Sequence, residues 1–183
     1  MSVPPVSGRP LPRTASVAPA AVRAEFAAEP ASDGFDAAQA QGKDRRAVLR
    51  AANGLGTASR SLEASARGLR AIRLPWFGSI EPARVQVVAT FKQGLQDAGA
   101  ALAAAERQVG TLESDDVATA AGAQTAQLRL SFDASSRLMG EILPGAQGTR
   151  KDLAAVKELT AIALENLAKD FHKVSEKLWL SGG

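Results

Sequence analysis

Large apolar residues recur every seven residues along most of this chain, and this spacing limits what the chain can fold into. The first set comprises Val48, Leu55, Leu62 and Leu69, interleaved with Ala51, Ala58, Ser65 and Ile72. Alternating steps of three and four residues place these side chains on one face of an α-helix. The interleaved residues are mostly small, which lets neighbouring helices approach closely. A long amphipathic helix is therefore predicted over residues 43–72.

Three further segments carry a stripe of the same kind, and helices are predicted over 80–113, 115–142 and 149–179. The first stripe comprises Val88, Leu95, Leu102 and Val109, interleaved with Phe91, Ala98, Ala105 and Leu112. The second is weaker and wider, with Val117, Ala121, Leu128, Phe132, Leu138 and Ile142. The third comprises Leu153, Val156, Ala163, Leu167, Phe171, Val174 and Leu178. No alternating strand pattern competes with these helices.

Residues that favour helix ends stand between the predicted helices. Ser79 or Glu81 can cap the second helix, with Pro82 in its first turn, where amide hydrogens lack intrahelical partners. Ser114 can cap the third helix, and Thr149 with Asp152 resembles a capping box for the fourth. These signals support the four-helix division.

One local signal conflicts with the first predicted helix. The sequence Asn53-Gly54-Leu55-Gly56 is typical of a helix stop. The apolar spacing nevertheless continues across it without a change of register. We therefore expect one helix here, with a kink at Gly54 as the alternative.

Short connections between long helices favour antiparallel neighbours. The predicted fold is thus all-α, an antiparallel up-down-up-down four-helix bundle over residues 37–180. Its composition agrees, because apolar residues make up 45% of the chain but aromatic residues only 4%, and alanine supplies much of the difference.

In this topology the first and third connections lie at the same end of the bundle. Trp76 and Phe77 in the first connection are therefore expected beside Leu143 and Pro144 in the third. We expect the two aromatic residues to close this end as a buried plug, since a large aromatic side chain removes much apolar surface from water. The alternative is an exposed anchor for a partner or a membrane surface, and these four residues form the candidate interaction tip.

Residues 1–36 differ in composition from the rest of the chain. Six of the nine prolines lie between Pro4 and Pro30, without helical apolar spacing. Such a segment buries too little surface to offset the entropy of ordering it, so a disordered Pro/Ala/Ser/Arg-rich tail is predicted. A plain flexible tail, a tether and a non-cleaved export signal are the alternatives. Since no apolar run reaches the length of a spanning helix, we expect a soluble protein, in the cytoplasm unless the tail directs export.

Residues suited to catalysis or metal binding are sparse. The chain has no cysteine and a single histidine, His172, which excludes thiol chemistry and paired-histidine metal sites. Glu158, Glu165 and His172 share a stripe, but seven residues along a helix span about 10.5 Å, too far for one metal ion. We expect this stripe to face solvent. The sequence therefore predicts no enzymatic activity, no metal and no cofactor.

One charged feature exceeds what the modest net charge of +3 suggests. Between Lys43 and Arg73 eight basic residues stand against Asp44 and Glu63. The candidate basic face comprises Arg46, Arg50, Arg60, Arg67 and Arg70. Guanidinium groups suit bidentate contact with carboxylates or phosphates, although a solubilising outer face is the simpler interpretation. Nucleic-acid binding is disfavoured, because aromatic residues do not interleave with the arginines.

Two functional classes fit these observations. The first is a non-catalytic helical-bundle interaction protein that docks a protein partner or associates with itself, with the tail as tether or export signal. The second is an amphipathic protein whose helices open to bind a lipid or polymer surface. In this second class, the arginines of the basic face would bind anionic groups of the surface.

Overall fold

The computed structural model describes residues 31–182 of a chain that divides into two units, 1–36 and 37–183. The elements are α1 (Ala31–Ala71), α2 (Glu81–Val109), α3 (Asp115–Ile142), the 3₁₀ helix η1 (Leu143–Gln147) and α4 (Arg150–Ser181). No strand occurs among the described residues. The predicted all-α four-helix bundle is confirmed.

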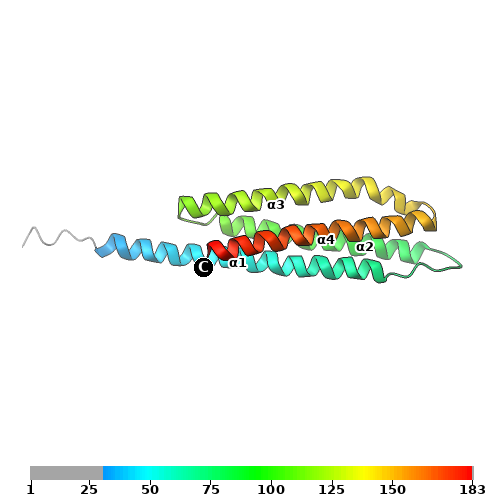
Figure 1. The fold of residues 1–183 in the computed structure, drawn as a ribbon, viewed down its shortest axis with the longest axis horizontal. Coiled ribbons are helices and arrows are strands. Elements are labelled where there is room, and N and C mark those ends of the chain that lie inside the picture. The colour runs from blue at the N-terminus through cyan, green and yellow to red at the C-terminus, as the bar shows by residue number, and fades with distance from the viewer. Residues whose placement is uncertain (1–30, 183) are drawn as a thin grey trace, which may run out of the picture. The chain divides into compact units, whose positions relative to one another are not determined.

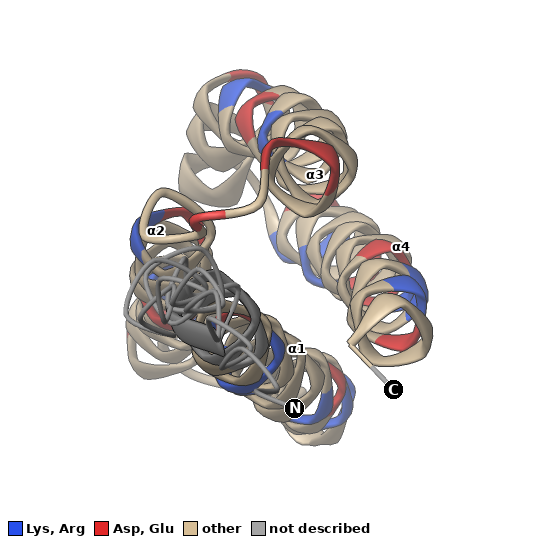
Figure 2. Ribbon diagram, turned by 90° about the vertical axis from the view of Figure 1, so that its left-hand side faces the viewer, with Lys and Arg blue, Asp and Glu red and all other residues tan. Residues whose placement is uncertain are grey.

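Helices that follow one another in the chain also lie side by side in the second unit. Viewed end-on, the four helices stand at four corners in chain order (Figure 2). The loop between α1 and α2 lies at the same end as η1 (Figure 1), and Arg84 Nε donates to the carbonyl oxygen of Ala146 in η1 at 2.6 Å. The first and third connections therefore share one end, as the topology predicts.

Helices α1 and α4 meet along small side chains, which we call the α1–α4 seam: Ala52, Ser59, Ala168 and Ser175. Ser59 Oγ donates to the carbonyl oxygen of Ala168 at 2.8 Å. Ser175 Oγ donates to that of Ala52 at 2.7 Å. On each helix the serine that donates lies seven residues from the alanine that accepts. The two hydrogen bonds therefore fix the register of the antiparallel pair.

The core is distributed unequally among the helices. Its largest fully buried side chains include Phe91 of α2 and Phe171 of α4. Ten residues of α4 are buried, whereas α3 buries only Ala121, Thr125 and Leu128. Leu138, predicted to face the core, is 43% exposed. That part of the α3 prediction is wrong, because the core-facing residues around it step to Ser135, Met139 and Ile142 instead.

Helix α1 begins well before the predicted start at residue 43. Residues 31–42 lack an apolar stripe but contain several alanines and glutamines, which favour a helix by themselves. The predicted disordered tail lies outside the described residues except for 31–36, which belong to α1. Gly54 does not interrupt α1, which confirms the continuous helix.

The other helix ends follow the predictions in part. The N-cap of α2 is Ile80, without a side-chain capping bond, so the cap predicted at Ser79 or Glu81 is wrong. The capping box of Thr149 and Asp152 is confirmed, and Pro82 occupies the first turn of α2. Helix α2 ends at Val109 rather than 113, with Gly110 as its C-cap. Ser114 is the N-cap of α3 but makes no capping bond with its side chain.

Candidate functional site

The aromatic tip, Trp76 and Phe77, projects from the loop between α1 and α2. Trp76 is 82% exposed and Phe77 is 92% exposed. The predicted buried plug is therefore wrong. Ile72 and Ala146 are buried at this end instead, and Leu74 packs partly against the core. The small residues between the helices bring them close together, so these side chains close the end without an indole.

Arg150, in the first turn of α4, holds the backbone of the aromatic tip. Its Nη2 donates to the carbonyl oxygen of Leu74 at 3.2 Å, and its Nη1 to that of Trp76 at 3.4 Å. Its guanidinium carbon lies 4.7 Å from the centre of the Trp76 ring, a cation–π contact. One side chain thus fixes both the loop backbone and one face of the indole.

Lys157, two turns along α4, holds the start of the same loop. Its Nζ donates to the carbonyl oxygens of Arg70 at 3.3 Å and Ile72 at 3.1 Å. A cation at the C-terminal end of α1 also opposes the negative end of the helix dipole. Gly78 turns the chain back toward α2 with φ of +86°, a conformation that favours glycine. The aromatic tip is therefore displayed on an anchored loop.

The other two residues of the predicted tip belong to the connection between α3 and α4. Leu143 is half-buried in η1, and Pro144 is exposed. Arg84 Nη2 also donates to the carbonyl oxygen of Gly148 at 3.2 Å, so this connection is anchored as well. The structure places all four predicted residues at one end, with the aromatic pair as the most exposed.

Most of the candidate basic face lies along the outside of α1. Arg46, Arg50, Arg60 and Arg67 are exposed. Arg67 Nη1 lies 3.9 Å from Glu63 Oε2, a loose pair between two solvated side chains. Such a surface agrees with the simpler interpretation of a solvated face.

Arg70 differs from the other arginines, because it faces α4. Its Nε donates to Glu158 Oε1 at 3.0 Å, and its Nη1 and Nη2 donate to both oxygens of Glu165. The hydrogen bonds from Arg70 hold the pKa of Glu165 below its ordinary value and raise the pKa of the arginine. Glu158 is exposed, as expected, whereas Glu165 is half-buried, and both carboxylates pair with Arg70 across the edge between α1 and α4. His172 is exposed and lies 3.3 Å from Glu176.

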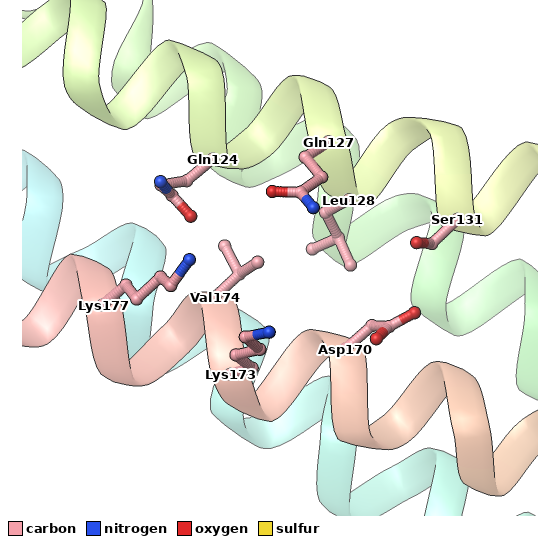
Figure 3. Close-up of a pocket in the computed structure, with 8 residues that line it drawn as sticks. All are labelled: Gln124, Gln127, Leu128, Ser131, Asp170, Lys173, Val174 and Lys177. Atoms are coloured by element: carbon pink, nitrogen blue, oxygen red, sulfur yellow. The ribbon is translucent and has the colours of Figure 1, made fainter.

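A polar pocket of about 40 Å³ lies between α3 and α4, which otherwise pack against each other (Figure 3). It is lined by Gln124, Gln127, Leu128, Ser131, Asp170, Lys173, Val174 and Lys177. Gln124 Oε1 is buried and forms no hydrogen bond. The sequence pattern did not predict this pocket, although Gln124, Gln127 and Ser131 follow one another on α3 at steps of three and four residues.

Asp44 of α1 anchors the opposite end of the bundle. Its side chain is buried, and its two carboxylate oxygens each accept a backbone hydrogen bond at 2.8 Å, from Glu113 and from Ser114. The carboxylate thereby satisfies the two amides just before α3, which differ from the amides that a side-chain cap by Ser114 would bond. Nothing in the local sequence distinguishes Asp44 from a solvated acid, so this role was not predicted.

The described residues contain no cluster of three His, Cys, Asp or Glu side chains that could hold a metal ion. None of the helices within residues 31–182 combines the length and the apolar character needed to cross a bilayer. Comparisons of the chain with protein-family models, with curated proteins and with solved structures found no match. The geometry of the described residues is therefore what bears on function.

Proposed function

We propose that this protein is a non-catalytic helical-bundle interaction protein that docks its partner through the aromatic tip. The observation that carries this proposal is the exposure of two consecutive aromatic side chains, Trp76 and Phe77, on a loop whose backbone is held by Arg150. Exposed aromatic side chains are costly to leave in water, and they supply much of the binding energy where partners cover them.

The anchoring of the loop supports docking in a second way. A flexible loop loses conformational entropy when it binds, at about 0.5–1.5 kcal/mol per immobilised side chain. Arg150 and Lys157 hold four carbonyl oxygens of the chain around this loop before any partner arrives. The surface is thus preorganised, which favours a binding role over a merely irregular connection.

The test combines stability with partner capture. Trp76→Ala with Phe77→Ser should lower the free energy of unfolding by only about 1 kcal/mol, mainly the lost cation–π contact. Partners recovered by the wild type from extracts of the native host should be lost with this variant. Light scattering should show whether the wild type also loses self-association.

The matched control is Arg46→Gln with Arg60→Gln and Arg67→Gln, which removes charge from the basic face and leaves the aromatic tip intact. Partner capture should survive in this control. If the arginine variant loses the partner while the aromatic-tip variant still captures it, the docking surface lies on α1 and the proposal is refuted.

A second candidate is the amphipathic protein whose helices open on a lipid or polymer surface. The sparse burial of α3, with three buried residues, favours it, since little apolar contact would be lost on opening. Gln124→Cys with Lys177→Cys, two residues that line the same pocket, allows a short crosslinker to join α3 to α4 in this cysteine-free chain. Surface binding that persists after crosslinking would argue against opening.

A further inference from the structure

We propose that the surface recognised by the aromatic tip is the interface of an anionic lipid bilayer, which the tip enters with the bundle closed. The inference rests on the proposed docking function and adds the chemistry of the partner. It depends on three features: the shape of the tip, the charges beside it and the contrast with the opposite end of the bundle.

The shape of the tip suits a flat, layered surface. Trp76 and Phe77 are adjacent and both largely exposed on the loop at the end of the bundle, so a surface covering this end can contact both. Indole rings favour the boundary between headgroups and acyl chains, where one edge is apolar and the other is wet. Arg150 covers one face of the Trp76 ring. In this arrangement its guanidinium group would lie at the level of the lipid headgroups.

The charges beside the tip favour anionic headgroups. Arg73 and Lys151 are exposed, and they stand next to the loop and next to Arg150. Three acids nearby are engaged by the chain itself: Glu81 with Arg84, Asp152 with Thr149, and Glu158 with Arg70. Glu141, in the last turn of α3, is exposed and remains the opposing charge. The positive charges of Arg73 and Lys151 are therefore available to an anionic surface that covers the aromatic tip.

The opposite end of the bundle provides an internal contrast. Trp179 and Leu180 are also exposed there, at 54% and 80%. Their surroundings carry both signs, with Glu176 and Lys177 on α4, Asp115 and Asp116 at the start of α3, and Arg45 of α1, which lines a pocket with Ser181. The charge at this end is therefore mixed, and Trp179 and Leu180 stand on a helix rather than on an anchored loop, which is how the two ends differ.

The experiment uses the full chain with vesicles of phosphatidylcholine and phosphatidylglycerol in equal amounts, and with vesicles of phosphatidylcholine alone. Trp179→Phe leaves Trp76 as the only tryptophan, and its emission should shift to the blue on the anionic vesicles. Trp76→Phe leaves Trp179 as the reporter, whose emission should stay unchanged. Co-sedimentation of both proteins gives the affinity.

Variants separate the apolar from the electrostatic contribution. Trp76→Ala with Phe77→Ser should weaken binding to anionic vesicles roughly a hundredfold, because two large side chains lose their burial. Arg73→Gln with Lys151→Gln should weaken it about fivefold per charge and reduce its dependence on salt. The triple variant Arg46→Gln, Arg60→Gln, Arg67→Gln is the matched control, which removes charge from the side of the bundle and should bind like the wild type.

Each outcome decides the proposal. Binding to anionic vesicles that needs the aromatic tip supports it. Absence of vesicle binding, a blue shift of Trp179 alone, or binding lost only with the side arginines overturns it. If the tip variant also loses a captured protein while the wild type ignores vesicles, the docking function stands and the lipid assignment fails, because the tip then fits a protein groove.

Discussion

Helices α3 and α4 are of similar length, 28 and 32 residues, yet they are held in the bundle very differently. Helix α4 buries ten residues and shares the α1–α4 seam, where hydroxyls of Ser59 and Ser175 bond across the interface. Helix α3 buries three residues, and a polar pocket between it and α4 leaves Gln124 Oε1 without a partner. An amphipathic stripe thus determines which face turns inward but not how firmly the helix is held.

The difference lies in how few large apolar residues the stripe of α3 buries. Thr125 of α3 is buried, and its hydroxyl donates to the carbonyl oxygens of Ala121 and Gly122 in the same helix. Leu130 points outward and is 71% exposed. Helix α4 also buries a threonine, Thr160, which bonds back to Val156 and Lys157, but leucine, alanine and phenylalanine fill most of its other buried positions. Helix α3 therefore contributes fewer buried side chains to the core than α4 does.

The largest expected effect compares one phenylalanine on each helix. Phe171→Ala in α4 should lower the free energy of unfolding by about 3–5 kcal/mol, because it leaves a cavity in the core. Phe132→Ala in α3 should cost only about 1 kcal/mol, since that ring is half-buried against Gly99. Urea denaturation of the two variants measures both values. Equal losses would show that α3 contributes as much core as α4.

Amide hydrogen exchange compares the two helices without any substitution. Amides in the middle of α3 should exchange at least about tenfold faster than those in the middle of α4, a difference on the order of 1.4 kcal/mol in opening free energy. Mass spectrometry of peptides from each helix resolves this. Uniform protection would mean that the bundle opens only as a whole and would remove the basis for a separable α3.

The α3–α4 interface should also be open to improvement. Gln124→Leu should raise the free energy of unfolding by up to about 1 kcal/mol, because it removes a buried acceptor that has no partner. Gln127→Leu is the matched control, since Gln127 is exposed on the same pocket and should change little. A loss of stability in Gln124→Leu would show that the amide is satisfied in solution.

The smallest expected effect concerns the ion pairs between α1 and α4. Arg70 lowers the pKa of Glu165 below its ordinary value of 4.5, so the contribution of this carboxylate is complete above that pH and is lost as pH falls through the lower folded value. The advantage of the wild type over Glu165→Gln should therefore shrink on acidification. Urea denaturation at neutral pH and below the ordinary pKa measures the shrinkage, with Glu141→Gln, an exposed glutamate, as control. A constant difference between wild type and Glu165→Gln would contradict the assignment.

The sequence predicted the four helices because periodicity is a local property of the chain. It also predicted the capping box, whose residues Thr149 and Asp152 lie one turn apart. The contacts that it missed join residues far apart in sequence. Nothing around Asp44 indicates a partner at Ser114, and nothing around Arg150 indicates the carbonyl oxygen of Trp76. The plug prediction failed for the same reason, since the space at the end of the bundle depends on how closely all four helices pack.

The anchored connections carry a consequence for how the chain selects one topology. Four alanine-rich helices with similar stripes can be arranged around a core clockwise or anticlockwise with nearly the same apolar burial. The charged anchors are not interchangeable in this way: a carboxylate of α1 meets amide hydrogens before α3, while a guanidinium of α4 meets carbonyl oxygens after α1. These four charged side chains therefore add specific polar contacts at the two ends of the bundle to the apolar packing of its core.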